Sequence, residues 1–276
     1  IMAEGGSLFH KANLLQLHTM RAELLAAQGE QAAAAGELAV LRKLSQEIIG
    51  NQSPDSAERD VRLERGDSAV REVGLVTGDF DAVRASARAS IQRLESIRST
   101  DESIGARREV QLRFAYESLG KAAAEEGAWI EAETAFRSAL TFTTERTGNS
   151  FGYTSVLTAQ LTSAGRRAEY QTWLAWICAH SDKAAEAVTL ATSAREYQRS
   201  QLAKVGDADM TLRLAAAFAE IALARAQLAA GASATEARAN LAAAEARIAG
   251  LPAEFRATTW VKQVMAKLEK TKALTP

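Results

Sequence analysis

The stretch "LGKAAAEEGAWIEAETAFRSAL", residues 119–140, holds two apolar patterns separated by a glycine. Before Gly127, apolar residues recur every three or four positions, and Ala132 and Ala139 continue that spacing after it. Such spacing is typical of amphipathic helices. The stretch therefore predicts an αα-hairpin with a tight turn, in which small residues at Gly120 and Ala132 let the two backbones approach closely.

The hairpin pattern recurs along the chain about every 50 residues. Gly29, Gly78 and Gly127 lie 49 residues apart, twice in succession. The positions equivalent to Ala132 are spaced by 49, 49, 55 and 50 residues: Ala34, Val83, Ala132, Ala187 and Ala237. Self-similarity at a fixed period is the signature of a repeat architecture. The expected units span residues 8–49, 55–99, 101–146, 150–205 and 207–249.

Helix boundaries are predicted by capping residues and by the repeat. Helix starts are expected at Ser53-Pro54-Asp55 and at Asp207, and helix ends at Gly50 and Gly206. Turns within the hairpins are expected near Gly29, Gly78, Gly127, Ser181 and Gly231.

Two segments need separate treatment. Residues 151–181 are compatible with one long, kinked helix or with two helices broken at Gly165. Residues 251–276 form the expected C-terminal capping helix and tail, which an open array needs at its end. The apolar stripe of that helix is expected at Phe255, Trp260, Val264 and Leu268.

Composition supports helices and limits the kinds of partner. The 276 residues include three prolines, and 33 basic residues balance 34 acidic ones to a net charge of −1. This balance predicts no general attraction to nucleic acid or to an anionic membrane. The chain has no apolar stretch of about 20 residues, and residues 1–10 lack the basic start and apolar core of a secretory signal. We therefore expect a cytoplasmic protein.

No catalytic or metal-binding motif is evident. The single cysteine, Cys178, excludes an intrachain disulfide and a site built from several thiolates. His10 and His18 are eight residues apart, which we interpret as incidental. Glu125 and Glu126 are adjacent on a helix, so their side chains diverge and cannot grip one substrate atom. The chain is expected not to be an enzyme, and no metal or cofactor is expected.

Residues 113–146 resemble the tetratricopeptide repeat (TPR). The match consists of Tyr116, Leu119, Gly120, Ala123, Gly127, Ala132, Phe136 and Ala139. Thr144 stands where the family usually has proline, and the period exceeds the family's usual length of about 34 residues. The period looks like that of a long-helix variant common in bacterial signalling proteins, where such arrays often follow a kinase or another effector domain.

The resemblance covers about residues 8–250 and implies both a fold and a mode of action. The implied fold is all-α: a right-handed α-solenoid of about five antiparallel helix pairs plus the C-terminal capping helix. Such arrays bind peptides or partner proteins in a concave groove lined by the first helix of each pair, without a cofactor. Carried onto this chain, the groove positions include Arg65, Glu72, Phe114, Glu117, Lys121, Trp173, Trp176 and His180.

Two readings of the tryptophans and three of the function remain open. Trp173 and Trp176 are either exposed anchors for a partner or side chains packed between adjacent helices. The leading functional hypothesis is a protein- or peptide-binding scaffold, a regulatory part of a bacterial signalling protein. The alternatives are a self-association module that forms a homo-oligomer, and a small-molecule sensor or enzyme with a pocket inside the superhelix.

Overall fold

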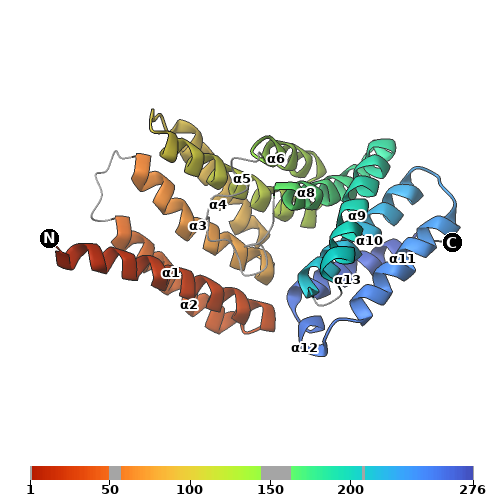
Figure 1. Cartoon of the computed structure of the whole chain (residues 1–276), viewed down its shortest axis with the longest axis horizontal. Coiled ribbons are helices and arrows are strands. Elements are labelled where there is room, and N and C mark those ends of the chain that lie inside the picture. The colour runs from red at the N-terminus through yellow and green to blue at the C-terminus, as the bar shows by residue number, and fades with distance from the viewer. Residues whose placement is uncertain (1, 50–56, 144–162, 207–208, 276) are drawn as a thin grey trace. The chain divides into compact units, whose positions relative to one another are not determined.

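A computed structural model of the chain describes residues 2–49, 57–143, 163–206 and 209–275. Within these ranges the regular structure is helical, with no strand, which confirms the predicted all-α class (Figure 1). The helices are α1 (Met2–Gln28), α2 (Gln31–Ile49), α3 (Ala57–Thr77), α4 (Phe80–Ser96), α5 (Glu102–Glu125), α6 (Trp129–Thr141), α8 (Ser163–Cys178), α9 (Ala184–Val205), α10 (Met210–Ala229), α11 (Ala234–Ala249), α12 (Ala253–Arg256) and α13 (Thr259–Lys272).

The helices pack in consecutive pairs, and the chain divides into two compact units. Unit 1 comprises residues 1–126 and 141–160, and unit 2 comprises residues 127–140 and 161–276. In unit 1, α1 packs on α2 and α3 on α4, and α5 packs on both helices of the pair before it. In unit 2, α8 packs on α9 and α10 on α11, and α13 packs on α10 and α11. The division follows Glu126, so α5 and α6, which the repeat assigns to one hairpin, belong to different units.

The turns within the pairs fall where the repeat predicts them. Gly29, Gly78, Gly127 and Gly231 each have a φ between +72° and +87°. This left-handed conformation is costly for any residue with a Cβ, because the Cβ approaches the following carbonyl oxygen. The fifth turn, between α8 and α9, includes the predicted Ser181. Glycine thus permits four of these five turns, and the predicted turn positions are confirmed.

The five residues that set the repeat have the same structural position. Each is the fourth residue of the second helix of its pair, each is buried, and each donates its backbone N–H to the carbonyl four residues before it: Ala34, Val83, Ala132, Ala187 and Ala237. The first turn of every second helix therefore presents a small side chain to the interior, as the sequence spacing predicts.

One pair shows how close the two helices come. A Cβ added at Gly74 on α3 would lie 2.5 Å from Cγ2 of Val83 on α4. Carbon atoms do not approach to that distance without displacement, so Gly74 is fixed by the contact. The contact explains why small residues are required where the two helices of a pair cross.

Several boundary predictions are settled and others lie outside the described residues. Gly206 follows the end of α9 with φ +74°, as predicted. Helix α10 is capped by Asp209, whose carboxylate accepts a hydrogen bond from the Leu212 N–H. Gly165 lies in the first turn of α8 and does not break it. The predictions for Gly50, Ser53-Pro54-Asp55, Thr144, Asp207 and residues 151–162 concern residues outside the described ranges.

The predicted C-terminal stripe is divided between two helices, because Phe255 lies on α12 whereas Trp260, Val264 and Leu268 lie on α13. On α13 the buried apolar residues are Val261 and Leu268, whereas Trp260 is only half-buried. Val261 therefore takes the core position that we predicted for Trp260. The physical reason is that α13 packs on α10 and α11, and Val261 lies in the core cluster with Phe218 and Leu241 of those helices.

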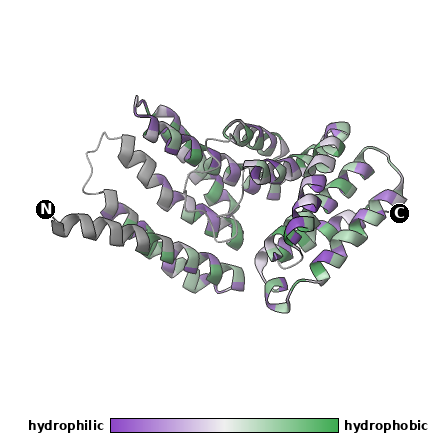
Figure 2. Ribbon diagram, in the orientation of Figure 1, coloured by the Kyte–Doolittle hydropathy of each residue, from purple (hydrophilic) through white to green (hydrophobic). Residues whose placement is uncertain are grey.

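Every helix of the described part carries polar as well as apolar residues (Figure 2). None of the described helices is long and apolar enough to cross a membrane.

Replacing Gly78 by alanine is expected to lower the free energy of unfolding by about 1 kcal/mol, because alanine must adopt the left-handed conformation. The matched control is Gly36→Ala, which changes a helical glycine of α2 with open space around its Cβ. That control is expected to raise the free energy of unfolding by about 0.5–1 kcal/mol. Urea denaturation measures both, and a change of the same sign in the two variants would contradict the turn assignment.

Replacing Ala187 by glutamate is expected to lower the free energy of unfolding by roughly 2–4 kcal/mol through overpacking and an unpaired buried charge. Ala187 is fully buried and packs with Cys178, Ala179 and Ala226. Ala185→Glu, two residues earlier on the exposed side of α9, should change stability by less than about 0.5 kcal/mol. Equal melting temperatures for the two variants would show that the inward face of α9 is assigned wrongly.

Candidate functional site

A row of charged residues follows the first helices of unit 1. Glu23 on α1, Glu72 on α3 and Lys121 on α5 lie 49 residues apart, so they occupy the same position of successive repeats. Helix α1 packs on α3, and α3 packs on α5. Residues at equivalent positions of neighbouring parallel elements line up across those elements. We call Glu23, Glu72 and Lys121 the charged row.

Glu23 is the most unusual member of the charged row. Only 3% of it is exposed, and its Oε1 has no hydrogen-bond partner among the described residues. Burial, and secondly the negative charge of Glu72, raise the pKa of Glu23 from 4.5 to about 8. A carboxyl group in this setting is neutral at pH 7, because ionisation would place a second negative charge beside Glu72 in a poorly solvated position.

The other end of the charged row is paired within α5. Nζ of Lys121 lies 2.5 Å from Oε1 of Glu117, one helical turn earlier. Glu117 is buried and Lys121 is half-buried. The guanidinium carbon of Arg113 lies 4.8 Å from the ring centroid of Phe114, and both residues are buried. Of the three groove positions expected on α5, only Lys121 therefore reaches solvent to an appreciable extent.

Unit 2 contains a cluster of aromatic side chains. Trp173 on α8 stacks on Phe136 at 5.7 Å between ring centroids, and it meets the edge of Phe218 at 4.9 Å. Nζ of Lys267, a buried residue of α13, lies 5.1 Å from the centroid of Trp173 and 5.8 Å from that of Phe218. Attraction between an ammonium group and the face of an aromatic ring stabilises this arrangement.

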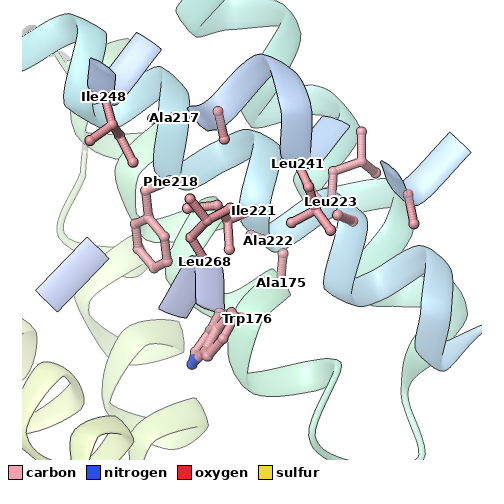
Figure 3. Packing of buried hydrophobic residues seen from close by; sticks show 14 of the residues in the cluster. Ala175, Trp176, Ala217, Phe218, Ile221, Ala222, Leu223, Leu241, Ile248 and Leu268 are labelled. Carbon is pink, nitrogen blue, oxygen red and sulfur yellow. The ribbon is translucent and has the colours of Figure 1, made fainter. Parts of the chain in front are cut away.

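Trp176 lies in the hydrophobic core of unit 2. It is 4% exposed and belongs to a cluster that includes Ala175, Phe218 and Ile221, as Figure 3 shows. Its backbone carbonyl accepts a hydrogen bond from Nδ1 of His180 at 2.7 Å. Of the two readings of this residue, the burial matches the one in which the indole packs between adjacent helices.

His180 is held between two tryptophans at the end of α8. Its ring stacks on Trp129 at 4.3 Å and lies 4.8 Å from Trp176. Burial lowers the pKa of His180, and the positive charges of Arg225 and Lys270 lower it further. The neutral imidazole is therefore favoured at pH 7, where it acts as an aromatic packing group.

The structure brings some predicted site residues together and leaves others apart. Glu117 contacts Lys121, and Trp176 contacts His180. Trp173 packs against the same core cluster as Trp176, and both rings contact Phe218. Trp173 also contacts Phe136 and Lys267. The side chain of Arg65 lies outside the described residues. Among the predicted residues, Glu72, Lys121, Trp173 and His180 are half-buried, while Phe114, Glu117 and Trp176 are buried.

Two residues of these sites were not predicted from the sequence. The repeat would have allowed Glu23 to be predicted, because it lies 49 residues before Glu72 and therefore occupies the same repeat position. Lys267 has no such signal, since its contact with Trp173 joins helices 94 positions apart in the numbering. Only tertiary packing brings these two residues together.

One group of side chains has the donor types of a metal site. The ligand atoms of Glu133, Cys178 and Glu186 lie within 4.8 Å of one another. Glu133 accepts hydrogen bonds from Arg137 and Lys183, and Glu186 accepts one from Arg137. Burial, and then the two carboxylates, raise the pKa of the Cys178 thiol to about 11, so the thiol is protonated at pH 7. The arrangement is an ion-pair network between α6 and α9, in which both carboxylates already have cationic partners.

Comparison with known proteins identified no match to a family model, a curated protein or a solved structure.

Trp176→Ala is expected to lower the free energy of unfolding by about 3–5 kcal/mol, because it leaves a cavity in the core of unit 2. Trp260→Ala provides the control, since Trp260 is half-buried on α13, and its loss should cost about 1 kcal/mol. Thermal and urea unfolding distinguish the two. An unchanged melting temperature for Trp176→Ala would contradict the core position and favour the alternative in which Trp176 is an exposed anchor for a partner.

The stability of the chain is expected to decrease with increasing pH through Glu23. Because the folded-state pKa of about 8 exceeds the ordinary value of 4.5, the folded protein binds more protons between these two values. Stability is therefore lost as pH rises from about 4.5 to about 8, and the loss is complete above that range. Glu23→Gln removes this dependence, so its stability advantage over the unsubstituted chain should grow between pH 6 and pH 9. A constant difference across that range, measured by urea unfolding, would show that Glu23 is ionised in the folded protein.

Proposed function

We propose that the chain is a TPR-like helical array that binds a protein or peptide partner along the exposed face of its first helices. The proposal includes a right-handed superhelical arrangement of the helix pairs. It is supported by the five equivalent turns and by the buried small residue at the fourth position of every second helix. The proposed setting is a regulatory part of a bacterial signalling protein, with no catalytic role and no cofactor.

The observation that carries the proposal is the unsatisfied acid at one end of the charged row. Glu23 is buried without a hydrogen-bond partner for Oε1, and Glu72 adds a second negative charge. Leaving a buried polar atom unpaired costs stability unless another group satisfies it. A lysine or arginine side chain of a partner, bound at the half-buried Glu72, would offset the negative charge that lies beside the buried Glu23.

The half-buried residues of the face have distinct roles in this proposal. Glu72 provides a half-buried carboxylate that attracts the basic side chain of the partner. Lys121, paired with Glu117, places a positive charge at the other end of the charged row. A partner segment with a basic residue followed by an acidic one would match both ends, and charges of this kind select the partner and its direction.

Unit 2 supplies a precedent for the recognition of a basic side chain. Lys267 of α13 lies over Trp173 and Phe218, so the aromatic cluster accepts an ammonium group from the chain itself. Trp173 and His180 are half-buried and flank the fully packed Trp176. In this proposal Trp176, Phe114 and Glu117 hold the helices in place rather than contact the partner.

Selection of peptides from a random displayed library tests the proposal. Against the unsubstituted chain, we expect enrichment of peptides that contain lysine or arginine. Binding of the enriched peptides should weaken at least tenfold in Glu72→Lys, because the introduced ammonium group repels the basic side chain of the peptide. Affinities are measured by fluorescence anisotropy with labelled synthetic peptides.

The matched control is Glu254→Lys, which makes the same charge change at an exposed residue of α12. This control should bind within twofold of the unsubstituted chain. If peptide affinity falls equally in both variants, the change in net charge explains the loss and the charged row does not. Equal affinity in all three proteins would exclude the charged row as the binding site.

A further inference from the structure

Two basic residues of unit 2, Arg225 and Lys270, form no ion pair or hydrogen bond within the part of the chain that the structure describes. Arg225 is half-buried on α10, and its Nε is buried without a hydrogen-bond partner. Lys270 is exposed on α13. A buried donor that lacks a partner costs stability. An anion bound at Arg225 would therefore supply both a hydrogen-bond acceptor and the opposite charge.

The packing of α8 on α10 places Arg225 beside His180. Trp173 on α8 meets the ring of Phe218 on α10 at 4.9 Å. Seven residues later on each segment come His180, in the turn that follows α8, and Arg225. Residues seven positions apart share one side of a helix. His180 and Arg225 therefore continue the contact of Trp173 with Phe218, two helical turns further along.

Lys270 approaches the same place from α13. It follows Lys267 by three residues, and Lys267 lies over the ring of Trp173. The two lysines share one side of α13, so Lys270 is displaced by one turn in the direction of the chain. The positive charges of Arg225 and Lys270 both lower the pKa of His180, in addition to the larger effect of burial. This effect is expected of cations that lie near the imidazole.

Acidic residues near this turn do not pair with the two cations. Asp182, two residues after His180, is exposed and forms no ion pair among the described residues. Glu133 and Glu186, which lie near Cys178, already accept hydrogen bonds from other basic side chains. The charges of Arg225 and Lys270 are therefore available to a ligand.

The ring of His180 is held in a fixed orientation. Its Nδ1 lies 2.7 Å from the backbone carbonyl of Trp176, and a carbonyl only accepts, so Nδ1 carries a hydrogen. Stacking on Trp129 at 4.3 Å holds the other side of the ring. Nε2 is then the ring atom that remains for a ligand, and no rotation of the ring is needed on binding.

We propose that Arg225, Lys270 and His180 bind a phosphoryl group, supplied by a phosphate monoester or by inorganic phosphate. Two permanent positive charges match a dianion, whereas a carboxylate would neutralise only one of them. The guanidinium group of Arg225 donates to two phosphoryl oxygens, and Lys270 adds a point charge. The bound dianion favours the protonated imidazole, so Nε2 of His180 donates the remaining hydrogen bond. This site lies in unit 2 and does not depend on the charged row.

Isothermal titration calorimetry of the whole chain at pH 7.5 with inorganic phosphate, phosphoserine and acetate tests the proposal. We expect saturable binding of one phosphate or phosphoserine per chain and at least tenfold weaker binding of acetate. Arg225→Gln and Lys270→Gln should each weaken phosphate binding at least fivefold. The matched control is Arg167→Gln, which removes the same charge from an exposed residue of α8 and should bind phosphate within twofold of the unsubstituted chain.

Lys270 is exposed, so Lys270→Gln is expected to fold normally and tests the site independently of Arg225→Gln. The absence of saturable phosphate binding, equal affinity for acetate and phosphate, or unchanged affinity in both variants would each overturn the proposal. Glu72→Lys should bind phosphate like the unsubstituted chain, so that failure of the charged row and failure of this site are distinguishable.

Nuclear magnetic resonance of the histidine ring protons locates the bound phosphate. Saturating phosphate should raise the pKa of His180 by about one unit and leave that of His18 on α1 unchanged. The spectrum of His180→Gln assigns the signal. Equal shifts at both histidines would show a general effect of salt and contradict the site. A comparison of a peptide that contains phosphoserine with inorganic phosphate identifies the source, because the tighter of the two ligands is the one that the site is built to bind.

Discussion

The close approach of paired helices within each unit is the constraint on which the rest of the structure depends. A glycine in the left-handed conformation reverses the chain in four of the five turns, and the fourth residue of the next helix must then be small. Gly74 against Val83 shows the limit, because even one added carbon would overlap Cγ2 of the valine. Alanine-rich helices meet this requirement and lose little side-chain entropy on folding.

Close packing of alanine leaves little apolar surface to specify the register, and buried ion pairs take part of that role. Arg71 and Glu64 are fully buried and bonded to each other, and Glu64 also accepts a hydrogen bond from Arg93 at 2.7 Å. In unit 2, fully buried Glu220 accepts hydrogen bonds from Arg199 and Arg247. Buried pairs add little net stability, but a misplaced register would leave their charges unpaired. Glu23 differs from Glu64 and Glu220 because its Oε1 has no hydrogen-bond partner among the described residues, and this difference makes its surroundings the candidate for recognition by a partner.

Different sides of the first helices differ in what their equivalent repeat positions share. Along the charged row, equivalent positions carry different charges, so each helix contributes its own specificity while the backbone geometry is repeated. On another side of the same helices, the equivalent positions Ala69 of α3 and Ser118 of α5, and Val73 of α3 and Ala122 of α5, carry apolar or small residues and are buried. A repeat protein thus uses one backbone pattern for variable recognition and for uniform stacking.

The sequence by itself determined the helical class, the turns and the inward positions of the second helices. The 49-residue spacing of Gly29, Gly78 and Gly127 carries this information because turn geometry and helix crossing are local requirements that act on the residues concerned. The same spacing also indicates that Glu23 occupies the repeat position of Glu72. Tertiary structure alone decided that Trp176 enters the core while Trp173 receives Lys267, and that Val261 rather than Trp260 faces inward on α13. Helical periodicity identifies an apolar face, but the neighbouring helices determine which part of that face is covered, and those neighbours come from distant parts of the chain.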